Sequence, residues 1–104
     1  MLSSTKIKIC GLRSTEASIV ASDAGADFLG FNFVEGVRRQ IQLTDAEQIL
    51  TDYREGRQTS KQPGLVGLFR DQDIDQVNKT ARTLELDYLQ LCGSEDEEYV
   101  SKVE

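Results

Sequence analysis

The chain has 104 residues, and its 12 Lys and Arg against 18 Asp and Glu give a net charge of −6. This length fits one small domain, and the acidic balance argues against a nucleic-acid partner, which needs clustered positive charge. No apolar run approaches the roughly 18 residues of a membrane span, and the opening "MLSSTK" lacks the apolar part of a signal peptide, so we expect a cytoplasmic protein with no membrane partner.

The first predicted unit is a strand followed by a helix. Residues 5–10, "TKIKIC", alternate polar and apolar side chains, which is typical of a strand. A helix is expected to begin near Ser14 or Thr15 and to end at Gly25. Its predicted apolar stripe consists of Ala17, Val20, Ala21 and Ala24.

The second unit repeats this order. Residues 27–33, "DFLGFNF", form a nearly continuous apolar run, as expected of a strand buried on both faces. Residues 44–47, "TDAE", match a capping box that opens a helix. The helix carries apolar residues at helical spacing, namely Ala46, Ile49, Leu50 and Tyr53.

The third unit follows a polar connection at 56–63. Residues 64–69, "GLVGLF", predict a strand, and Asp73 with Gln76 predicts the start of a helix. The apolar side of that helix consists of Ile74, Val77, Ala81 and Leu84.

The fourth unit begins with a predicted strand at 87–92, "DYLQLC". Residues 94–97, "SEDE", match a second capping box, which would open a helix of about two turns before the chain ends. We therefore interpret the acidic run 94–98 as helix capping, because carboxylates in a first turn interact favourably with the helix dipole.

Strict alternation of strands and helices predicts an α/β fold with a parallel sheet. Four such units fit either an open sheet or half of a (β/α)8 TIM barrel. The half-barrel is favoured because the chain lacks a GxGxxG or GxxxxGK[ST] phosphate loop, and because polar residues occupy one face of two strands. Lys6, Lys8 and Cys10 share a face of the first strand, and Gln90 interrupts the apolar residues of the fourth. We predict a single half-barrel domain over 1–104.

Cys10 ends the first strand, at the edge where parallel β/α folds bind ligands. A thiol with an ordinary pKa of about 8.5 is mostly protonated near neutral pH. The positive end of the following helix and the ammonium of Lys8, two residues earlier, would both favour the thiolate. A small buried apolar role is the alternative for Cys10.

Three other residues near strand ends are candidates. Cys92 ends the fourth strand, where packing or simple filling of the rim is the favoured interpretation. Arg38 and Arg39 follow the second strand, and a guanidinium suits a carboxylate or phosphate, although solvated surface charge is the alternative. Because the chain has no His, a Cys-His pair is excluded, and two cysteines 82 positions apart match no metal-binding spacing.

Five segments together resemble the N-terminal half of the phosphoribosylanthranilate isomerase family. They are "KIKICGLRSTEA", "SDAGADFLGFNF", "VRRQI", "VGLF" and "DYLQLCGSE", and their order and spacing cover essentially the whole chain. The family belongs to tryptophan biosynthesis, and its fold is a TIM barrel.

The resemblance implies an Amadori rearrangement of N-(5-phosphoribosyl)anthranilate without cofactor or metal. Cys10 corresponds to the general base that takes the proton from C2′, and Arg39 matches the arginine that holds the anthranilate carboxylate. Gln90 matches a polar residue of the barrel interior near the substrate, and Lys8 belongs to the same expected binding face.

Two departures from the family pattern matter. Cys92 stands where many relatives carry a histidine, which questions any role for this side chain. The family chain is about twice as long, and its general-acid aspartate and phosphate-binding loops lie in the second half. We therefore expect this chain to be inactive alone. We also expect it to pair with a complementary C-terminal half-barrel or with a second copy, or else to be a fragment of a longer polypeptide.

Two other functions remain open. A non-catalytic half-barrel that serves folding or assembly would tolerate Cys10→Ser. A thiol-dependent redox or binding protein would need Cys10 and Cys92 within disulfide range, with Cα atoms less than about 7 Å apart.

Overall fold

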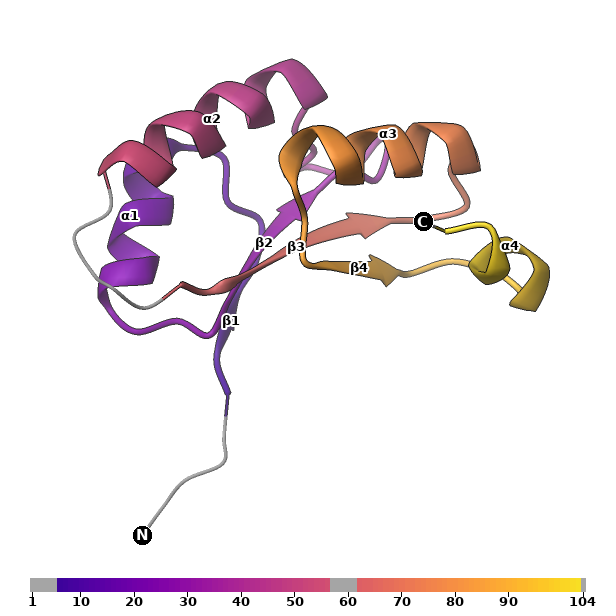
Figure 1. Cartoon of the computed structure of the whole chain (residues 1–104), viewed down its shortest axis with the longest axis horizontal. Helices are drawn as coiled ribbons and strands as arrows, with labels where there is room; N and C mark the ends of the chain where they lie inside the picture. Colours follow the sequence, from indigo (N-terminus) through magenta and orange to yellow (C-terminus); the bar gives the residue numbers. More distant parts are fainter. Residues whose placement is uncertain (1–5, 57–61, 104) are drawn as a thin grey trace, which may run out of the picture.

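Four parallel strands, each followed by a helix, form one twisted sheet in the order β1-β2-β3-β4 (Figure 1). The computed structural model describes residues 6–56 and 62–103. The predicted alternation of strands and helices is confirmed. The elements are β1 (Lys8–Ile9), α1 (Thr15–Asp23), β2 (Phe28–Asn32), α2 (Leu43–Gly56), β3 (Gly64–Phe69), α3 (Ile74–Leu84), β4 (Tyr88–Leu91) and α4 (Glu97–Ser101).

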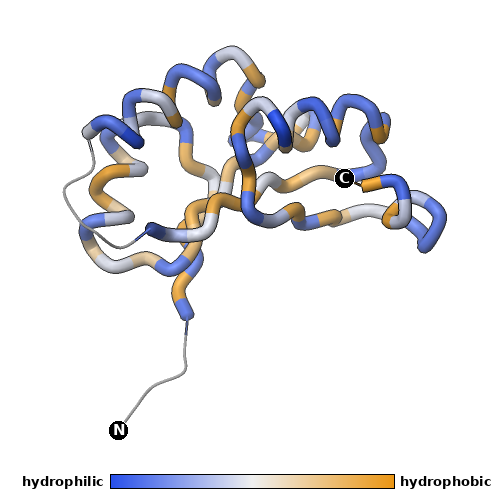
Figure 2. The backbone as a smooth tube through the Cα atoms, viewed as in Figure 1, coloured by the Kyte–Doolittle hydropathy of each residue, from blue (hydrophilic) through white to orange (hydrophobic). Residues whose placement is uncertain are grey.

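The first three helices cover one face of the sheet (Figure 1). Side chains of β2 and β3 that point to this face are fully buried, among them Leu29, Phe31 and Phe69. They pack against Leu50 and Val77 from two of the helices, within a single apolar cluster. Figure 2 shows the same division, with apolar strands and helices that are largely polar along their length. Apolar burial against the helices therefore holds the sheet together.

The opposite face of the sheet is strongly concave. Lys8 Nζ on β1 donates a hydrogen bond to Gln90 Oε1 on β4. In a flat sheet these strands would stand about 14 Å apart, which is three interstrand spacings, and strand side chains project roughly perpendicular to the sheet. The contact across two intervening strands therefore requires barrel-like curvature. This decides the alternative left open by the sequence, because the four strands curl as part of a barrel does.

Three of the four strands are shorter than predicted, and of these β2 covers 28–32 within the predicted 27–33 and β4 covers 88–91 within the predicted 87–92. The predicted strand 5–10 is paired only over Lys8–Ile9, and Thr5 lies outside the described residues. Residues 57–61 of the predicted polar connection also lie outside them. The strands at 64–69 and within 87–92 are confirmed.

The predicted apolar stripe of α1 is wrong. Val20 is 62% exposed, whereas Ser18 and Ser22 are buried. Both serines satisfy their hydroxyls, since Ser18 Oγ donates to Ser14 O at 2.9 Å and Ser22 Oγ accepts from Tyr53 at 3.1 Å. Small serines allow α1 to approach α2 closely, and the buried hydroxyls pay no penalty because each has a partner.

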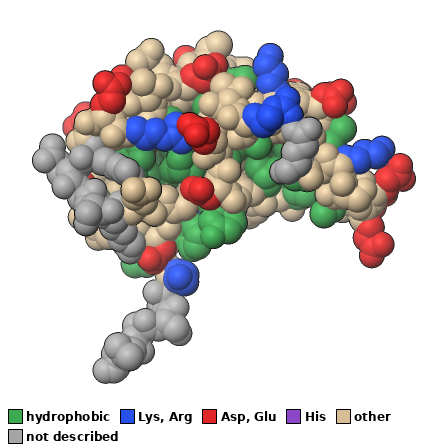
Figure 3. All heavy atoms as spheres, viewed as in Figure 1, with side chains coloured by type: hydrophobic (Ala, Val, Ile, Leu, Met, Phe, Trp, Pro, Cys, Tyr) green, Lys and Arg blue, Asp and Glu red, His purple; other side chains and the backbone are tan. Residues whose placement is uncertain are grey.

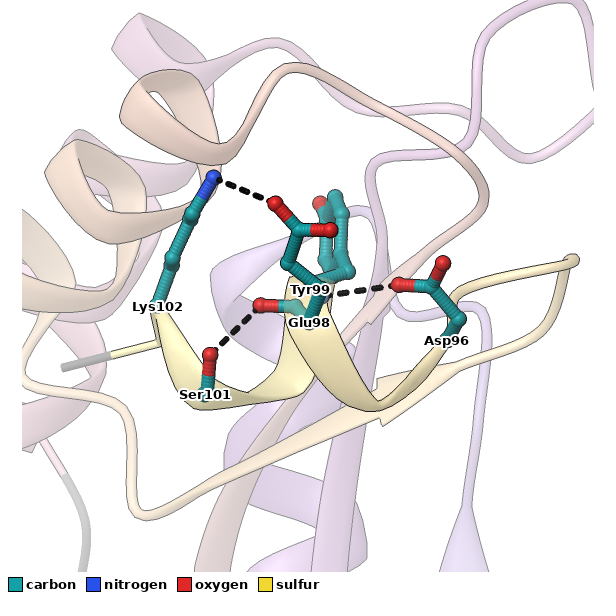
Figure 4. A network of polar contacts seen from close by, with 5 residues as sticks. All are labelled: Asp96, Glu98, Tyr99, Ser101 and Lys102. Atoms are coloured by element: carbon teal, nitrogen blue, oxygen red, sulfur yellow. Dashed lines mark hydrogen bonds and ion pairs between the residues drawn. The ribbon is translucent and has the colours of Figure 1, made fainter.

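Both predicted capping boxes are also wrong in position. Helix α2 begins at Leu43, so Thr44 is already helical. Helix α4 begins at Glu97, and its N-cap is Asp96, whose carboxylate accepts from Tyr99 N at 2.9 Å (Figure 4). The same view shows Lys102 paired with Glu98 one turn away. Ser94 and Glu95 lie outside the helix, and both form hydrogen bonds with Asp71 in the loop after β3.

Within the described residues, no helix is long and apolar enough to span a bilayer. On the face drawn in Figure 3, acidic and basic side chains are interspersed, with apolar side chains exposed between them.

Candidate functional site

Cys10 lies directly after β1, at the carboxyl end of the strand, and its side chain is half-buried. The β1–β2 register pairs Ile9 with Leu29, which brings Cys10 beside Gly30. A Cβ built on Gly30 would stand 2.7 Å from the Cys10 sulfur and 3.3 Å from its Cα. The thiol therefore occupies the space that a side chain at position 30 would take, on the concave face of the sheet.

Arg39 lies against the backbone next to this thiol. A Cβ on Gly11 would meet Arg39 Cδ at 2.7 Å and Nη1 at 3.0 Å. Gly11 also has φ of 75°, which favours glycine. The structure thus brings Arg39 to the residue that follows Cys10, although 28 positions separate Gly11 and Arg39 in the sequence.

The loop that carries Arg39 leaves β2 and returns to it. Gly36 adopts φ of 81°, and its N–H donates to Gln40 Oε1 at 3.1 Å. Ile41 N then donates to Asn32 O at 2.9 Å, so the end of the loop is fixed to the last residue of β2. Both ends of the loop are therefore held at the rim, while Arg38 and Arg39 project from its turn and are exposed.

Lys8 and Gln90 meet on the concave face through the hydrogen bond already described. Both are exposed side chains, and each is a polar group at the inner surface of the curled sheet. They lie on the same face as Cys10, since residues 8 and 10 alternate with Ile9 along the strand. An amide and an ammonium here suit a polar ligand rather than an apolar core.

A second cluster, the carboxylate clasp, joins the loops after β3 and β4 and consists of Asp71, Gly93, Ser94 and Glu95. Glu95 accepts hydrogen bonds from Asp71 N at 2.7 Å and from Gly93 N at 2.8 Å. Asp71 Oδ1 accepts from Ser94 N at 2.7 Å. Asp71 reaches this position with φ of 50°, and its carboxylate occupies the space that a Cβ on Gly93 would take. The two loops thus hold each other through side-chain acceptors and backbone donors.

The clasp alters two pKa values. Burial alone would raise the pKa of Glu95, but the backbone N–H groups of Asp71, Glu95 and Gly93 outweigh it and hold the pKa below its ordinary value. Burial, followed by the charges of Glu95, Asp73 and Asp71, raises the pKa of Tyr99. Tyr99 remains a donor, and its hydroxyl donates to Gln72 O at 2.6 Å.

Cys92 lies at the same rim, and its side chain is exposed. Its sulfur is 3.8 Å from Gln90 O. Within the described residues, no group of three His, Cys, Asp or Glu side chains could hold a metal ion.

Sequence reasoning missed two residues of the rim. Arg13 and Asn32 line a groove of about 550 Å³ together with Val37, Arg38 and Arg39 of the loop after β2. The sequence carried a usable signal for each, since Asn32 is a polar residue at the end of a buried strand and Arg13 follows Cys10 in the next loop. The clasp carried no such signal, because its acidic residues also match a helix start.

Comparison with known proteins identifies the relatives of this fold. The family model described as N-(5'phosphoribosyl)anthranilate (PRA) isomerase matches residues 7–104. The isomerase of Geobacter sp. (strain M21) is 41% identical over 99 residues, which are 95% of this chain and 46% of the relative. The isomerase of Candida albicans is 38% identical over 111 residues, covering 86% of this chain and 49% of the relative. This chain thus spans about half the length of the curated relatives that it matches.

Solved structures agree. The Thermotoga maritima phosphoribosyl anthranilate isomerase superposes with a TM-score of 0.83 at 27% identity, over 95% of this chain and 45% of that chain. The Thermus thermophilus enzyme gives 0.80 at 32% identity, over 95% and 46%. A phosphoribosyl anthranilate isomerase in complex with reduced 1-(o-carboxyphenylamino)-1-deoxyribulose 5-phosphate has a TM-score of 0.82 at 27% identity, over 95% of this chain and 48% of that chain. Because the family model covers nearly all of the sequence and the curled sheet superposes on these barrels, the chain belongs to the N-(5'-phosphoribosyl)anthranilate isomerase family.

Proposed function

We propose that this chain is the N-terminal half-barrel of a phosphoribosylanthranilate isomerase and carries the general base of an Amadori rearrangement. The observation that supports this most directly is the position of Cys10, half-buried at the end of β1, with Arg39 against the adjacent Gly11. A base and an anion-binding group together at the carboxyl ends of the strands suit a substrate that has both a carboxylate and an acidic C–H.

In this proposal, a general acid protonates the ring oxygen of the sugar, the bond from C1′ to that oxygen breaks, and a Schiff base forms. The thiolate of Cys10 removes the proton from C2′, which gives an enolamine. The enolamine then takes a proton at C1′ and loses the proton of its C2′ hydroxyl, so that C2′ becomes the ketone carbon. C2′ is oxidised and C1′ is reduced within one molecule, so the reaction consumes no cofactor.

Three other residues have binding roles. Arg39 holds the aryl carboxylate through paired hydrogen bonds. Gln90 and Lys8, joined on the concave face, contact the polar part of the substrate and fix its place above the sheet. The general acid and the phosphate site come from a complementary half-barrel, which corresponds to the part of the relatives that this chain does not span.

The isolated chain is therefore expected to show little turnover. The proposed partner is the complementary half-barrel, and a second copy of the chain competes for the same strand edges. Within the described residues, β1 and β4 each pair with only one strand, and an unpaired edge is a site for association.

The test is to co-express the chain with the C-terminal half of the Geobacter relative and to follow loss of the fluorescent anthranilate adduct. We expect turnover only in the mixture, because each half supplies one of the two proton-transfer groups. Cys10→Ser should lower kcat by about 10²–10⁴-fold, the usual contribution of a general base.

Cys92→Ser is the matched control, since it makes the same change at the exposed thiol of the rim. It should retain the turnover of the unchanged mixture. Full activity of the Cys10→Ser mixture would instead support a non-catalytic assembly role.

A further inference from the structure

The groove beside Cys10 is unusual in its charge. It has a volume of about 550 Å³ and lies at the carboxyl ends of β1 and β2. Its lining residues are Gly11, Arg13, Asn32, Val37, Arg38 and Arg39. Three of the six are arginines, and none is acidic. In a chain of net charge −6, this is a local concentration of positive charge.

The positive charge of this groove is not neutralised by the protein. Within residues 6–56 and 62–103, none of the three guanidiniums forms an ion pair. Asp45 lines a neighbouring groove that Arg13 also borders, but it forms no ion pair with Arg13. Neighbouring like charges repel one another, and an anion between them relieves that repulsion. The groove therefore favours an anionic ligand.

The geometry of the groove gives such a ligand several donors. Arg39 lies over Gly11, and Arg13 follows Gly11 by two residues on the same rim loop. Asn32 Oδ1 accepts from Val34 N at 3.0 Å, which orients its amide so that the NH₂ group remains for a ligand. Two guanidinium forks and an amide match the planar oxygens of a carboxylate.

We propose that Arg13 is a second carboxylate-binding residue, which acts with Arg39 and selects substrates whose aromatic ring bears a negative charge. This proposal rests on the function proposed above, because that function supplies the aryl carboxylate. It assigns the specificity to a residue of the loop after β1. In this loop Cys10 precedes Gly11, and Arg13 follows Gly11 by two residues.

The test measures binding to the chain itself, with anthranilate as the probe and its neutral amide, anthranilamide, as the comparison. The shift of the Gly11 amide resonance in a ¹⁵N spectrum gives each Kd. We expect anthranilate to bind at least about tenfold more tightly than anthranilamide, because charge-assisted hydrogen bonds are about twice as strong as neutral ones.

Arg13→Gln should weaken anthranilate binding about three- to tenfold and leave anthranilamide unchanged, as expected for one exposed charge-assisted contact. Arg13→Lys should recover part of the loss, because it keeps the charge without the planar fork. Lys79→Gln, the matched control, removes one positive charge from the exposed face of α3 and should change neither Kd.

A purely structural role of Arg13 would weaken both probes equally. The proposal is overturned if Arg13→Gln binds anthranilate like Lys79→Gln, or if the unchanged chain does not distinguish the two probes. Either result leaves the proposed isomerase intact when the assembled enzyme still turns over. If the co-expressed halves show no turnover but anthranilate binding still depends on Arg13, the result contradicts the proposed isomerase function and leaves the role of Arg13 in binding intact.

Discussion

At the scale of single residues, two glycines determine where the proposed reactive groups can lie. Gly30 leaves space for the Cys10 sulfur, and Gly11 leaves space for the Arg39 side chain. The two glycines differ in what prevents a larger residue at their position. At Gly11 both the left-handed backbone and the guanidinium exclude a side chain, whereas at Gly30 only the thiol and the Cys10 backbone do.

Gly30→Ala should impair catalysis more than stability explains. The added methyl would meet the sulfur at 2.7 Å and the Cys10 Cα at 3.3 Å, so the thiol must move. A displacement of about 1 Å in a reacting group costs on the order of 10²-fold in rate. We expect kcat of the assembled enzyme to fall by about this factor.

Gly67→Ala is the control for this prediction. Gly67 is also a strand glycine, and its added methyl would meet Leu86 Cδ1 at 2.7 Å, far from the thiol on the helix-covered face. Both changes should destabilise the fold by about 1–3 kcal/mol through overpacking, measured by urea unfolding. Equal kcat values for the two variants would show that Gly30 does not position the thiol.

At the scale of elements, the carboxylate clasp connects the β3–α3 loop to the β4–α4 loop. Gln72 extends this connection, because its side chain donates to Phe33 O at the end of β2, at 2.9 Å, and its carbonyl accepts from Tyr99. Three strand ends and α4 are thereby held together by hydrogen bonds. The rim on this side is fixed before any ligand binds, which reduces the entropy cost of binding.

The clasp predicts an acid-sensitive contribution to stability. The pKa of Glu95 is lowered in the folded chain, so its contribution is present above the unfolded pKa of about 4.3 and is lost as the pH falls through the folded pKa. Glu95→Gln should lower the urea midpoint at pH 7, because the amide offers one acceptor oxygen in place of two. It should also reduce the difference in midpoint between pH 7 and pH 3.

Glu47→Gln makes the same change at an exposed position of α2 and should leave both midpoints near those of the unchanged chain. If Glu95→Gln and Glu47→Gln unfold alike at both pH values, the clasp does not contribute to stability.

At the scale of the whole molecule, exposed apolar side chains concentrate at the two open edges of the curled sheet. Ile7 is 55% exposed beside β1, and on the β4 side Tyr88 is 56% and Val100 53% exposed. Next to β4, a groove of about 360 Å³ is lined largely by apolar residues, among them Leu89 and Leu91. Both edges thus offer apolar surface together with unpaired backbone groups.

The chain alone should therefore self-associate at micromolar concentration, and the complementary half should convert the assemblies to a 1:1 pair. Sedimentation velocity measures both. Ile7→Lys should shift the chain toward monomer, because a charge at the edge opposes strand pairing. Val20→Lys changes a residue of similar exposure, 62%, on α1 and should not alter the association. A monomer at every concentration, or equal effects of both variants, would contradict this prediction.

The sequence by itself determined the order of elements and the layer that they form. Apolar periodicity predicted the strands at 28–32, 64–69 and 88–91 and the helices between them, although it gave the wrong buried face for α1. The position of Cys10 at a strand end followed from the same reasoning. The resemblance of five segments supplied the family, which the comparisons confirm.

Only the tertiary structure decided the face of α1, the caps of α2 and α4, the curvature of the sheet and the groove with Arg13. Most of these depend on a partner distant in the sequence, namely Tyr53 for the serines of α1, Gln90 for Lys8, and Arg39 for Gly11. The cap of α4 is a local contact between Asp96 and Tyr99, but Glu95 before it accepts from Asp71 N on the neighbouring loop. Periodicity reports that a side chain is buried or exposed, but it contains no information on which segment lies opposite. Such contacts form only when the strands align and bring their carboxyl ends to one rim.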